Sequence, residues 1–234
     1  MSFANKTVIV TGAVGNLGKA AAKAFADQGA NLVLVDLKRE SLAAAFGAES
    51  ASTLFAPANL LEQSGAAGFA QAALTRFKRI DVLCNIAGGF RMGEAVHETS
   101  DENWNFLFDI NTRTLLHAVR AVVPHMISAG GGKIVNVGAF AAQKGVAQMG
   151  AYTAAKGTVI RMTEAMAAEL RDKNINVNCV LPTIIDTLDN RAAMPKADPA
   201  KWVAPADLAN VMVFLASDAA RAVHGATVPV TGLS

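Results

Sequence analysis

Short apolar runs, often β-branched, alternate along the chain with longer stretches whose apolar positions recur at helical spacing. The apolar runs predict strands at 7–11, 31–36, 52–56, 81–85, 133–137, 176–180 and 227–230. The stretches between them predict helices near 17–28, 39–46, 62–78, 101–128, 152–172 and 205–217. Runs such as VLVD and VLCN are apolar on both faces, which is typical of buried parallel strands. This alternation predicts an α/β fold, a single Rossmann-like doubly wound parallel sheet with helices on both faces.

Length and composition place the chain among well-packed proteins. It has 234 residues, of which 52% are hydrophobic and 17% charged, which predicts an ample core and excludes a disordered chain. For an α/β chain, this length fits a single domain over residues 1–234, in which the Pro-rich stretch 182–205 is the longest candidate loop. The 21 basic and 19 acidic residues nearly cancel and form no long basic run, so we expect no nucleic-acid partner.

Other sequence features bear on location, redox state and metals. No segment reaches about 18 uncharged apolar residues, so we expect no membrane span. The start of the chain, MSFANKTVIV, lacks the charged start and cleavage site of a signal peptide, so a cytoplasmic protein is expected. Cys84 and Cys179 sit in apolar runs and are expected to be buried thiols. The four histidines share no ligand spacing, so no metal site is expected.

A glycine-rich turn follows the first predicted strand. The segment TGAVGNLG, residues 11–18, leads directly into a predicted helix. Glycines here let the backbone turn tightly and approach a pyrophosphate, and the helix N-terminus behind them offers free N–H groups and partial positive charge. Such a segment can also be an ordinary tight turn. The strand before it, the helix after it and an acid at the end of the next strand favour a dinucleotide site.

That acid is Asp36, which stands where a ribose-binding carboxylate belongs. A carboxylate there accepts hydrogen bonds from both ribose hydroxyls and repels a 2′-phosphate, so we expect NAD, with NADH favoured over NADPH. Lys38 and Arg39 follow closely and would partly reverse this preference. The other interpretation of Asp36 is a helix N-cap.

Tyr152 and Lys156 form the candidate acid–base pair. They stand four residues apart at the start of a predicted helix, so both side chains lie on one face. An unperturbed tyrosine has a pKa near 10, too high for acid–base work at neutral pH. A neighbouring ammonium favours the phenolate and is expected to lower that pKa. The alternative is a half-buried tyrosine beside a surface lysine.

Over essentially its whole length the chain resembles the short-chain dehydrogenase/reductase family. The motifs that carry the resemblance are TGAVGNLG at 11–18, NIAG at 85–88, Asn111 in DIN, IVNV at 134–137, YTAAK at 152–156 and LP at 181–182. The resemblance implies hydride transfer to or from a nicotinamide, with Tyr152 as proton donor or acceptor. It implies that Lys156 lowers the tyrosine pKa and holds the nicotinamide ribose, and that Asn111 holds a water in a proton relay.

The resemblance also implies a homodimer or homotetramer acting on a small-molecule substrate. Its implied cofactor-binding residues are Gly12, Gly15, Asn16, Leu17, Gly18, Asp36, Asn59, Leu60, Asn85, Ala87, Gly88, Lys156, Pro182 and Thr187.

Four positions depart from the family pattern. Asn16 replaces the usual middle glycine of the turn, and we expect the turn to be kept because asparagine tolerates a left-handed φ. Asn59 replaces an aspartate that often contacts adenine, and Thr183 replaces the glycine after Pro182. The family's catalytic serine belongs thirteen residues before the tyrosine, where this chain has Ala139, and no serine lies anywhere from 129 to 216.

The missing hydroxyl has three competing explanations. Losing one preorganised donor typically costs about 2.7–4 kcal/mol in carbonyl reduction. Another donor, Gln143 or Gln148, could replace it, although both could equally be solvated loop residues. The substrate could do without it. The chain could also be a nucleotide-binding protein without catalysis, against which the intact Tyr152, Lys156 and Asn111 count.

Within the family, the dihydropteridine reductases carry an alanine at this position. The chain resembles them in AGGF at 87–90, in YTAAKG at 152–157 and in the predicted substrate loop LPTIIDTLDNRAAMPKADPAKW at 181–202. The resemblance implies NADH-dependent reduction of a quinonoid dihydropterin or a similar conjugated heterocycle. Such a substrate is already electron-poor and depends less on a polarising hydroxyl at position 139. NIAG and Asn111 resemble the corresponding residues of ordinary carbonyl-reducing family members. The alternative is therefore a ketone reductase or alcohol dehydrogenase with a substitute donor.

Several residues are candidates for binding such a flat substrate. Phe90 would stack on the heterocycle, unless it is a core aromatic near a turn. Asn190, with Asp186 and Arg191, has the polarity to meet a pterin edge, and the alternative for all three is loop capping and surface pairing. Trp202 would either close the loop over the site or anchor it.

Overall fold

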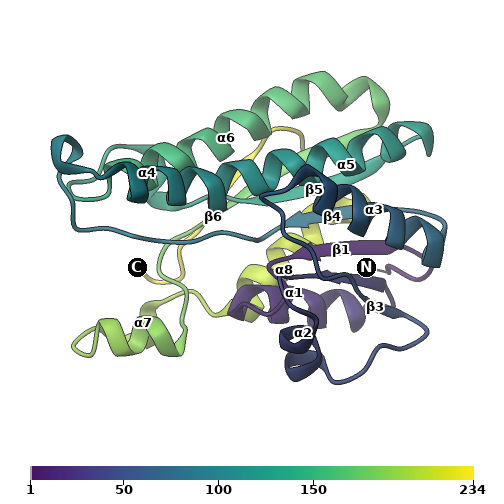
Figure 1. Ribbon diagram of the computed structural model, residues 1–234, viewed down its shortest axis with the longest axis horizontal. Helices are drawn as coiled ribbons and strands as arrows, with labels where there is room; N and C mark the ends of the chain where they lie inside the picture. Colours follow the sequence, from purple (N-terminus) through teal and green to yellow (C-terminus); the bar gives the residue numbers. More distant parts are fainter. Residues whose placement is uncertain (1) are drawn as a thin grey trace.

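The computed structural model describes residues 2–234, which form a seven-stranded parallel sheet in the order β3-β2-β1-β4-β5-β6-β7 (Figure 1). Every residue of the first, fourth and sixth strands is buried, as the two-sided apolar runs predicted. The expected Rossmann-like sheet is therefore confirmed. Its strands are β1 (Thr7–Thr11), β2 (Asn31–Val35), β3 (Thr53–Phe55), β4 (Val82–Asn85), β5 (Gly132–Val137), β6 (Ile175–Pro182) and β7 (Thr227–Val230).

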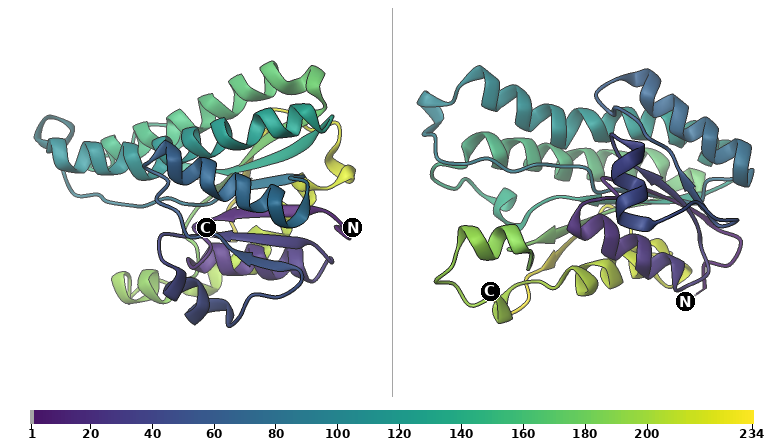
Figure 2. Two further views of the ribbon diagram at one scale, coloured as in Figure 1. Left: turned by 45° about the vertical axis from the view of Figure 1, so that its right-hand side comes forward. Right: turned by 60° about the horizontal axis from the view of Figure 1, so that its bottom comes forward.

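Helices cover both faces of this sheet (Figures 1 and 2). One face carries α3 (Gln63–Phe77), α4 (Asp101–Phe108), α5 (Thr114–Ser128) and α6 (Gly150–Leu170). The opposite face carries α1 (Asn16–Ala26), α2 (Arg39–Phe46) and α8 (Pro205–Ala216). Each helical layer presses an apolar stripe onto the sheet, so a separate core lies on each face, one around Phe69 and Val122, the other around Phe25 and Met212.

The strand order determines where a ligand can bind. β1 lies between β2 and β4. The chain adds β2 and β3 on one side of β1 and then returns to add β4 on the other side, so the direction of strand addition reverses between β1 and β4. In doubly wound sheets, ligands bind at such a switch point, beyond the carboxyl ends of the strands. Because all seven strands are parallel, Thr11, Asp36, Asn85, Val137 and Pro182 end or follow their strands along this one edge.

The prediction of one continuous helix at 101–128 was wrong, because a π-helical turn, Asp109–Arg113, separates α4 from α5. Three side chains in and beside this turn donate to the carbonyl four residues earlier: Asn111 Nδ2 to Leu107 O at 2.9 Å, Thr112 Oγ1 to Phe108 O at 2.5 Å and Thr114 Oγ1 to Ile110 O at 2.8 Å. Side-chain donors of this kind compete with the backbone N–H groups and loosen the helix locally.

The long loop expected at 182–205 contains a short helix, α7 (Leu188–Ala193), which Figure 1 shows near the C-terminus. Trp202 closes this segment and is only 7% exposed, so it anchors the loop. The backbone N–H of Leu233, near the C-terminus, donates to Lys201 O at 3.0 Å and adds a second attachment. Cys84 and Cys179 are buried free thiols, as expected.

Candidate functional site

The glycine-rich turn packs too tightly for side chains. Gly12 has a φ of +64°, and a Cβ there would lie 2.8 Å from the Ala87 Cα in the segment after β4. A Cβ on Gly18 would lie 2.2 Å from the Gly12 carbonyl oxygen, so this glycine lets α1 begin directly against the turn. Asn16 is the first residue of α1 and has no positive φ, so the left-handed role expected for it was wrong.

The N-terminus of α1 is open to an anion. Its N-cap is Gly15, which has no side chain to accept the first N–H groups, and the first turn holds no acidic residue. Leu17 and Gly18 are buried behind the turn, whereas Gly15 and Asn16 are exposed. Free N–H groups and the positive end of the helix dipole therefore point out of the sheet edge, which fits a pyrophosphate.

Asp36 lies beside this turn. Its Oδ2 accepts from Val14 N at 3.0 Å and its Oδ1 accepts from Leu37 N at 2.8 Å. The N-cap of α2 is Lys38, so the interpretation of Asp36 as a helix cap was wrong. Arg39 pairs with Glu49, and its Cζ lies 5.9 Å from the Phe55 ring centroid.

The expected adenine-side residues are held by local bonds. Asn59 Oδ1 accepts from Leu61 N at 3.1 Å, and Asn59 Nδ2 donates to Glu62 Oε1 at 2.9 Å. The neighbouring Leu60 is buried, and its carbonyl oxygen accepts from His117 Nδ1 at 2.9 Å. Asn59 therefore shapes the turn after β3 and keeps one N–H donor and one acceptor lone pair free.

Asn85 lies at the end of β4 and links strands. Its Nδ2 donates to Asn136 Oδ1 at 2.9 Å, and Asn136 Nδ2 donates to Thr163 Oγ1 on α6 at 2.8 Å. All three residues are buried, so the chain of bonds ties β4, β5 and α6 together below the sheet edge. The Ala87 N–H that follows donates to Thr11 Oγ1 at 3.2 Å.

Three chemically active side chains converge above this edge. Lys156 is buried and its Nζ donates to Val137 O at 2.8 Å. A Cβ on Gly88 would lie 2.8 Å from Asn111 Oδ1 and 3.2 Å from Lys156 Nζ, so any larger residue would push these two groups out of their present positions. Tyr152 lies one helical turn before Lys156 on α6. Asn111 is fixed because it exchanges two hydrogen bonds with the backbone of Gly89.

Burial changes the acidity of both residues of the pair. It lowers the pKa of Lys156 to about 8 and raises the pKa of Tyr152 to about 12. The lowering that we expected for Tyr152 is therefore wrong for the chain taken alone, because removal from water outweighs the effect of the neighbouring ammonium.

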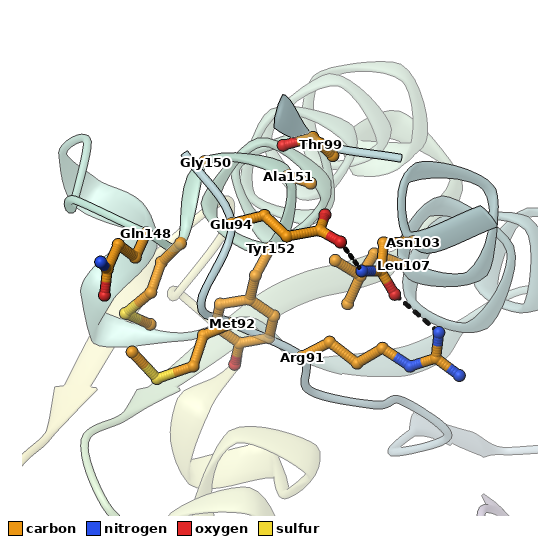
Figure 3. Close-up of a pocket in the computed structure, with 11 residues that line it drawn as sticks. Arg91, Met92, Glu94, Thr99, Asn103, Leu107, Gln148, Gly150, Ala151 and Tyr152 are labelled. Carbon is orange, nitrogen blue, oxygen red and sulfur yellow. Dashed lines mark hydrogen bonds between the residues drawn. The ribbon is translucent and has the colours of Figure 1, made fainter. Parts of the chain in front are cut away.

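The structure gives position 139 no substitute hydroxyl. Ala139 is 5% exposed and lies just after β5, where it presents only a methyl group. Gln143 is exposed, and its side-chain amide makes no hydrogen bond within residues 2–234. Gln148 is exposed and has a left-handed φ of +60°, and Figure 3 shows its amide pointing away from the Tyr152 ring.

Phe90 lies against the catalytic candidate. Its ring meets that of Tyr152 edge to face, with centroids 4.8 Å apart and planes 88° apart. Because Phe90 is 54% exposed, the interpretation of it as a core aromatic was wrong.

The polar residues of the 182–205 segment bond to one another. Asp186 and Arg191 form a two-bond ion pair at 2.6 and 2.7 Å. Asn190 donates its amide to Ile185 O at 2.8 Å, and its backbone N–H is capped by Thr187 Oγ1 at 3.1 Å. Loop capping therefore describes Asp186, Asn190 and Arg191 better than contact with a pterin edge.

A pocket beside Tyr152 holds residues that the sequence interpretation missed (Figure 3). Its walls come from the segment after β4, from α4 and from the start of α6. The missed residues among them are Arg91, Met92, Glu94 and Asn103, whereas Gln148, which also lines the pocket, was already a candidate. The only sequence signal for them is that Arg91 and Met92 directly follow AGGF at 87–90.

Residues 2–234 contain neither a metal-ligating cluster nor a membrane-spanning helix. Nowhere in that range do three His, Cys, Asp or Glu side chains gather as a metal site would require. Of the helices formed by the same residues, none combines the length and apolar character needed to span a membrane.

Comparison with known proteins agrees with the fold and with the order of the motifs. The sequence profile described as "short chain dehydrogenase" matches residues 6–197. The chain is 34% identical to "D-threitol dehydrogenase" of Mycolicibacterium smegmatis over 97% of this chain and 92% of that protein. It is 32% identical to "(2S)-[(R)-hydroxy(phenyl)methyl]succinyl-CoA dehydrogenase subunit BbsD" of Thauera aromatica over 99% of this chain and 97% of that protein.

A solved structure leads to the same family. The 3-ketoacyl-(acyl-carrier-protein) reductase of Brucella melitensis, complexed with NADH, superposes with a TM-score of 0.88 at 26% identity, covering 99% of this chain and 98% of that one. With the parallel sheet, the glycine turn and the Tyr152–Lys156 pair in place, these matches assign the chain to the short-chain dehydrogenase family of oxidoreductases.

Proposed function

We propose that the protein is an NAD(H)-dependent oxidoreductase whose substrate is already electron-poor and conjugated, with quinonoid dihydropteridine as the favoured case. The observation that carries the proposal is that Tyr152, Lys156 and Asn111 are all present while Ala139, just after β5, offers only a methyl group. The residues for proton transfer are therefore kept, while the serine hydroxyl that would polarise an isolated carbonyl is absent.

The cofactor end supports NAD(H). The open N-terminus of α1 fits the pyrophosphate, and Asp36 lies next to the glycine turn, where its carboxylate would take the ribose hydroxyls. Arg39, whose guanidinium would otherwise be free to bind a 2′-phosphate, is paired with Glu49. The structural relative from Brucella melitensis was solved with NADH. When bound, the nicotinamide supplies or accepts the hydride.

The proton steps fall to the chain's own side chains. Tyr152 Oη donates a proton to the substrate during reduction and accepts a proton from it during oxidation. Lys156, fixed by Val137 O, holds positive charge one helical turn away and stabilises the phenolate when it forms. The Asn111 amide is bonded to Gly89 and Leu107, so it holds the segment after β4 against the π-helical turn.

The substrate preference follows from position 139. One preorganised donor contributes about 2.7–4 kcal/mol to carbonyl chemistry. Neither Gln143 nor Gln148 takes that role within the described chain, because both are exposed and Gln148 points away from Tyr152. A conjugated imine or activated carbonyl already carries the polarisation that a serine would provide. Phe90, exposed and edge-on to Tyr152, offers such a flat substrate an aromatic face.

A second candidate is an ordinary alcohol or ketone substrate. It is favoured by the names of the relatives, which include "D-threitol dehydrogenase" and "Cyclohexanol dehydrogenase". Under this alternative a donor must come from the substrate itself or from a rearranged loop.

Restoring the hydroxyl distinguishes the two candidates. We expect Ala139→Ser to raise kcat/KM for simple ketones by about tenfold or more, out of the roughly 10²–10³-fold that one preorganised donor contributes, and to change reduction of quinonoid dihydropteridine by less than about twofold. Ala141→Ser, two residues along the same segment, is the matched control. Ketone rates that Ala139→Ser leaves unchanged would contradict the proposal.

A further inference from the structure

The pocket beside Tyr152 contains an arginine that the proposed reaction has not used. Arg91 follows Phe90 and lines this pocket together with Met92 and Tyr152 (Figure 3). Its guanidinium carbon lies 3.9 Å from the centroid of the Phe106 ring on α4. Phe106 packs with Tyr152 against the small cluster formed by Leu107, Ala151 and Ala155. The cation is therefore stacked on the same apolar support that positions the catalytic tyrosine.

A hydrogen-bond chain fixes the rotation of this guanidinium. Arg91 Nη1 donates to Asn103 Oδ1 at 2.7 Å, and Asn103 Nδ2 donates to Glu94 Oε1 at 2.5 Å, as Figure 3 shows. Because a carboxylate can only accept, Glu94 fixes the orientation of the Asn103 amide and so turns its oxygen toward Arg91. Glu94 also accepts from Ser100 N at 3.2 Å and from Ser100 Oγ at 3.3 Å.

One edge of the planar Arg91 guanidinium has no hydrogen-bond acceptor within residues 2–234. Within residues 2–234, Arg91 uses only Nη1, for Asn103 and for a long 3.5 Å contact to Glu102, whose side chain is 85% exposed. The Nε and Nη2 donors have no protein acceptor there, and together they form the planar pair that binds a carboxylate through two parallel hydrogen bonds. The negative charge of Glu94 is already shared among the donors of Ser100 and Asn103, and the Asn103 amide separates it from the guanidinium.

We propose that Arg91 determines substrate specificity by binding a carboxylate carried on the conjugated substrate. This inference rests on the proposed function and names its substrate class more closely: a flat, electron-poor body between Phe90 and Met92, with an acidic group on Arg91. Phe90 and Met92 are 54% and 56% exposed. Phe90 contacts the Tyr152 ring and Met92 lines the same pocket as Arg91, so both offer apolar surface near the charge.

The test uses a matched pair of ligands, isatin-5-carboxylate and isatin-5-carboxamide, which share an activated carbonyl and differ in charge. Calorimetric binding to the full chain is measured for wild type, Arg91→Gln and Arg91→Lys. We expect wild type to bind the acid about tenfold or more tightly than the amide, and Arg91→Gln to remove that preference while leaving amide affinity within about twofold. Arg91→Lys keeps the charge without the fork and should recover only part of the preference.

Arg161→Gln is the control, because Arg161 is an exposed arginine paired with Glu164 on α6, away from the pocket lining. Equal affinity of wild type for acid and amide, or an equal loss of both in Arg91→Gln, would overturn the role of Arg91. NADH-dependent turnover of the same two compounds is then recorded separately. Acid-selective binding without turnover of either compound would leave Arg91 as an anion site and count against the proposed reaction, so the two failures are distinguishable.

Discussion

At the scale of residues, the reaction centre depends on how closely a few groups approach one another. Tyr152 and Lys156 come from one turn of α6, whereas Asn111 comes from the π-helical turn before α5. Gly88 makes the meeting possible, because a Cβ at that position would press on both Asn111 Oδ1 and Lys156 Nζ. The acid–base role assigned to Tyr152 and the ribose role assigned to Asp36 can each be tested by one substitution.

Tyr152→Phe removes only the phenolic oxygen and keeps the ring that packs edge to face on Phe90. We expect turnover to fall by at least about 10²-fold, because a positioned acid–base group contributes about that much or more. NADH affinity, followed by fluorescence, should stay within about twofold of wild type, since the substitution leaves the cofactor end intact. A variant that turns over at the wild-type rate would remove Tyr152 from the mechanism.

Asp36→Ala removes the carboxylate that lies beside the glycine turn. We expect it to weaken NADH binding by about tenfold or more and NADPH binding by much less, because the carboxylate favours ribose hydroxyls and repels a 2′-phosphate. Glu49→Ala is the companion variant, since it frees Arg39 and should improve NADPH binding. Equal losses for the two cofactors in Asp36→Ala would remove the ribose role.

At the scale of elements, the carboxyl ends of β1, β2, β4, β5 and β6 assemble the site, and the α1 turn is its tightest point. The turn gives a direct test of how close packing supports cofactor binding.

Gly18→Ala would place a methyl group 2.2 Å from the Gly12 carbonyl oxygen, so the turn or α1 must shift. We expect loss of most NADH affinity and destabilisation of about 1–3 kcal/mol in chemical denaturation. Gly68→Ala on α3 has open space and should instead stabilise the chain by about 0.5–1 kcal/mol. Normal NADH binding by Gly18→Ala would contradict the account of the turn.

Local pattern was enough to predict most elements and the placement of Tyr152 and Lys156 on one helix. The strand runs are apolar on both faces, and the spacing of Tyr152 and Lys156 alone puts them on one helical face. Features that depend on particular side-chain contacts were missed. The break at 109–113 comes from side chains that bond back to carbonyls, and the setting of Arg91 comes from Asn103 and Phe106, twelve and fifteen residues further along the chain. The pKa of Tyr152 likewise depends on its burial, which sequence spacing does not reveal.

At the scale of the whole molecule, burying Lys156 makes stability depend on pH. Burial lowers the pKa of Lys156 from 10.5 to about 8 in the folded chain. Between these values the unfolded chain holds the extra proton, so the contribution of Lys156 to the free energy of unfolding rises with pH and is complete above about pH 10.5. Below about pH 8 the folded chain carries the full cost of a buried charge.

Lys156→Met removes this dependence. We expect the free energy of unfolding of wild type, minus that of the variant, to increase by on the order of 1–3 kcal/mol from pH 7.5 to pH 10.5. Tyr152 and Cys179 also titrate in this range, but both chains contain them, so most of their contribution cancels in the difference. A difference that stays flat or falls with pH would show that Lys156 is not buried in its charged form.

The most direct test of the central claim is the initial rate of NADH consumption with quinonoid dihydropteridine, measured beside simple ketones and 3-oxoacyl thioesters. The account predicts rapid reduction of the conjugated substrate and rates at least about 10²-fold lower for the unactivated ketones, because Ala139 supplies no donor. Ketone reduction at an equal or higher rate would contradict it and would mean that another group replaces the missing hydroxyl.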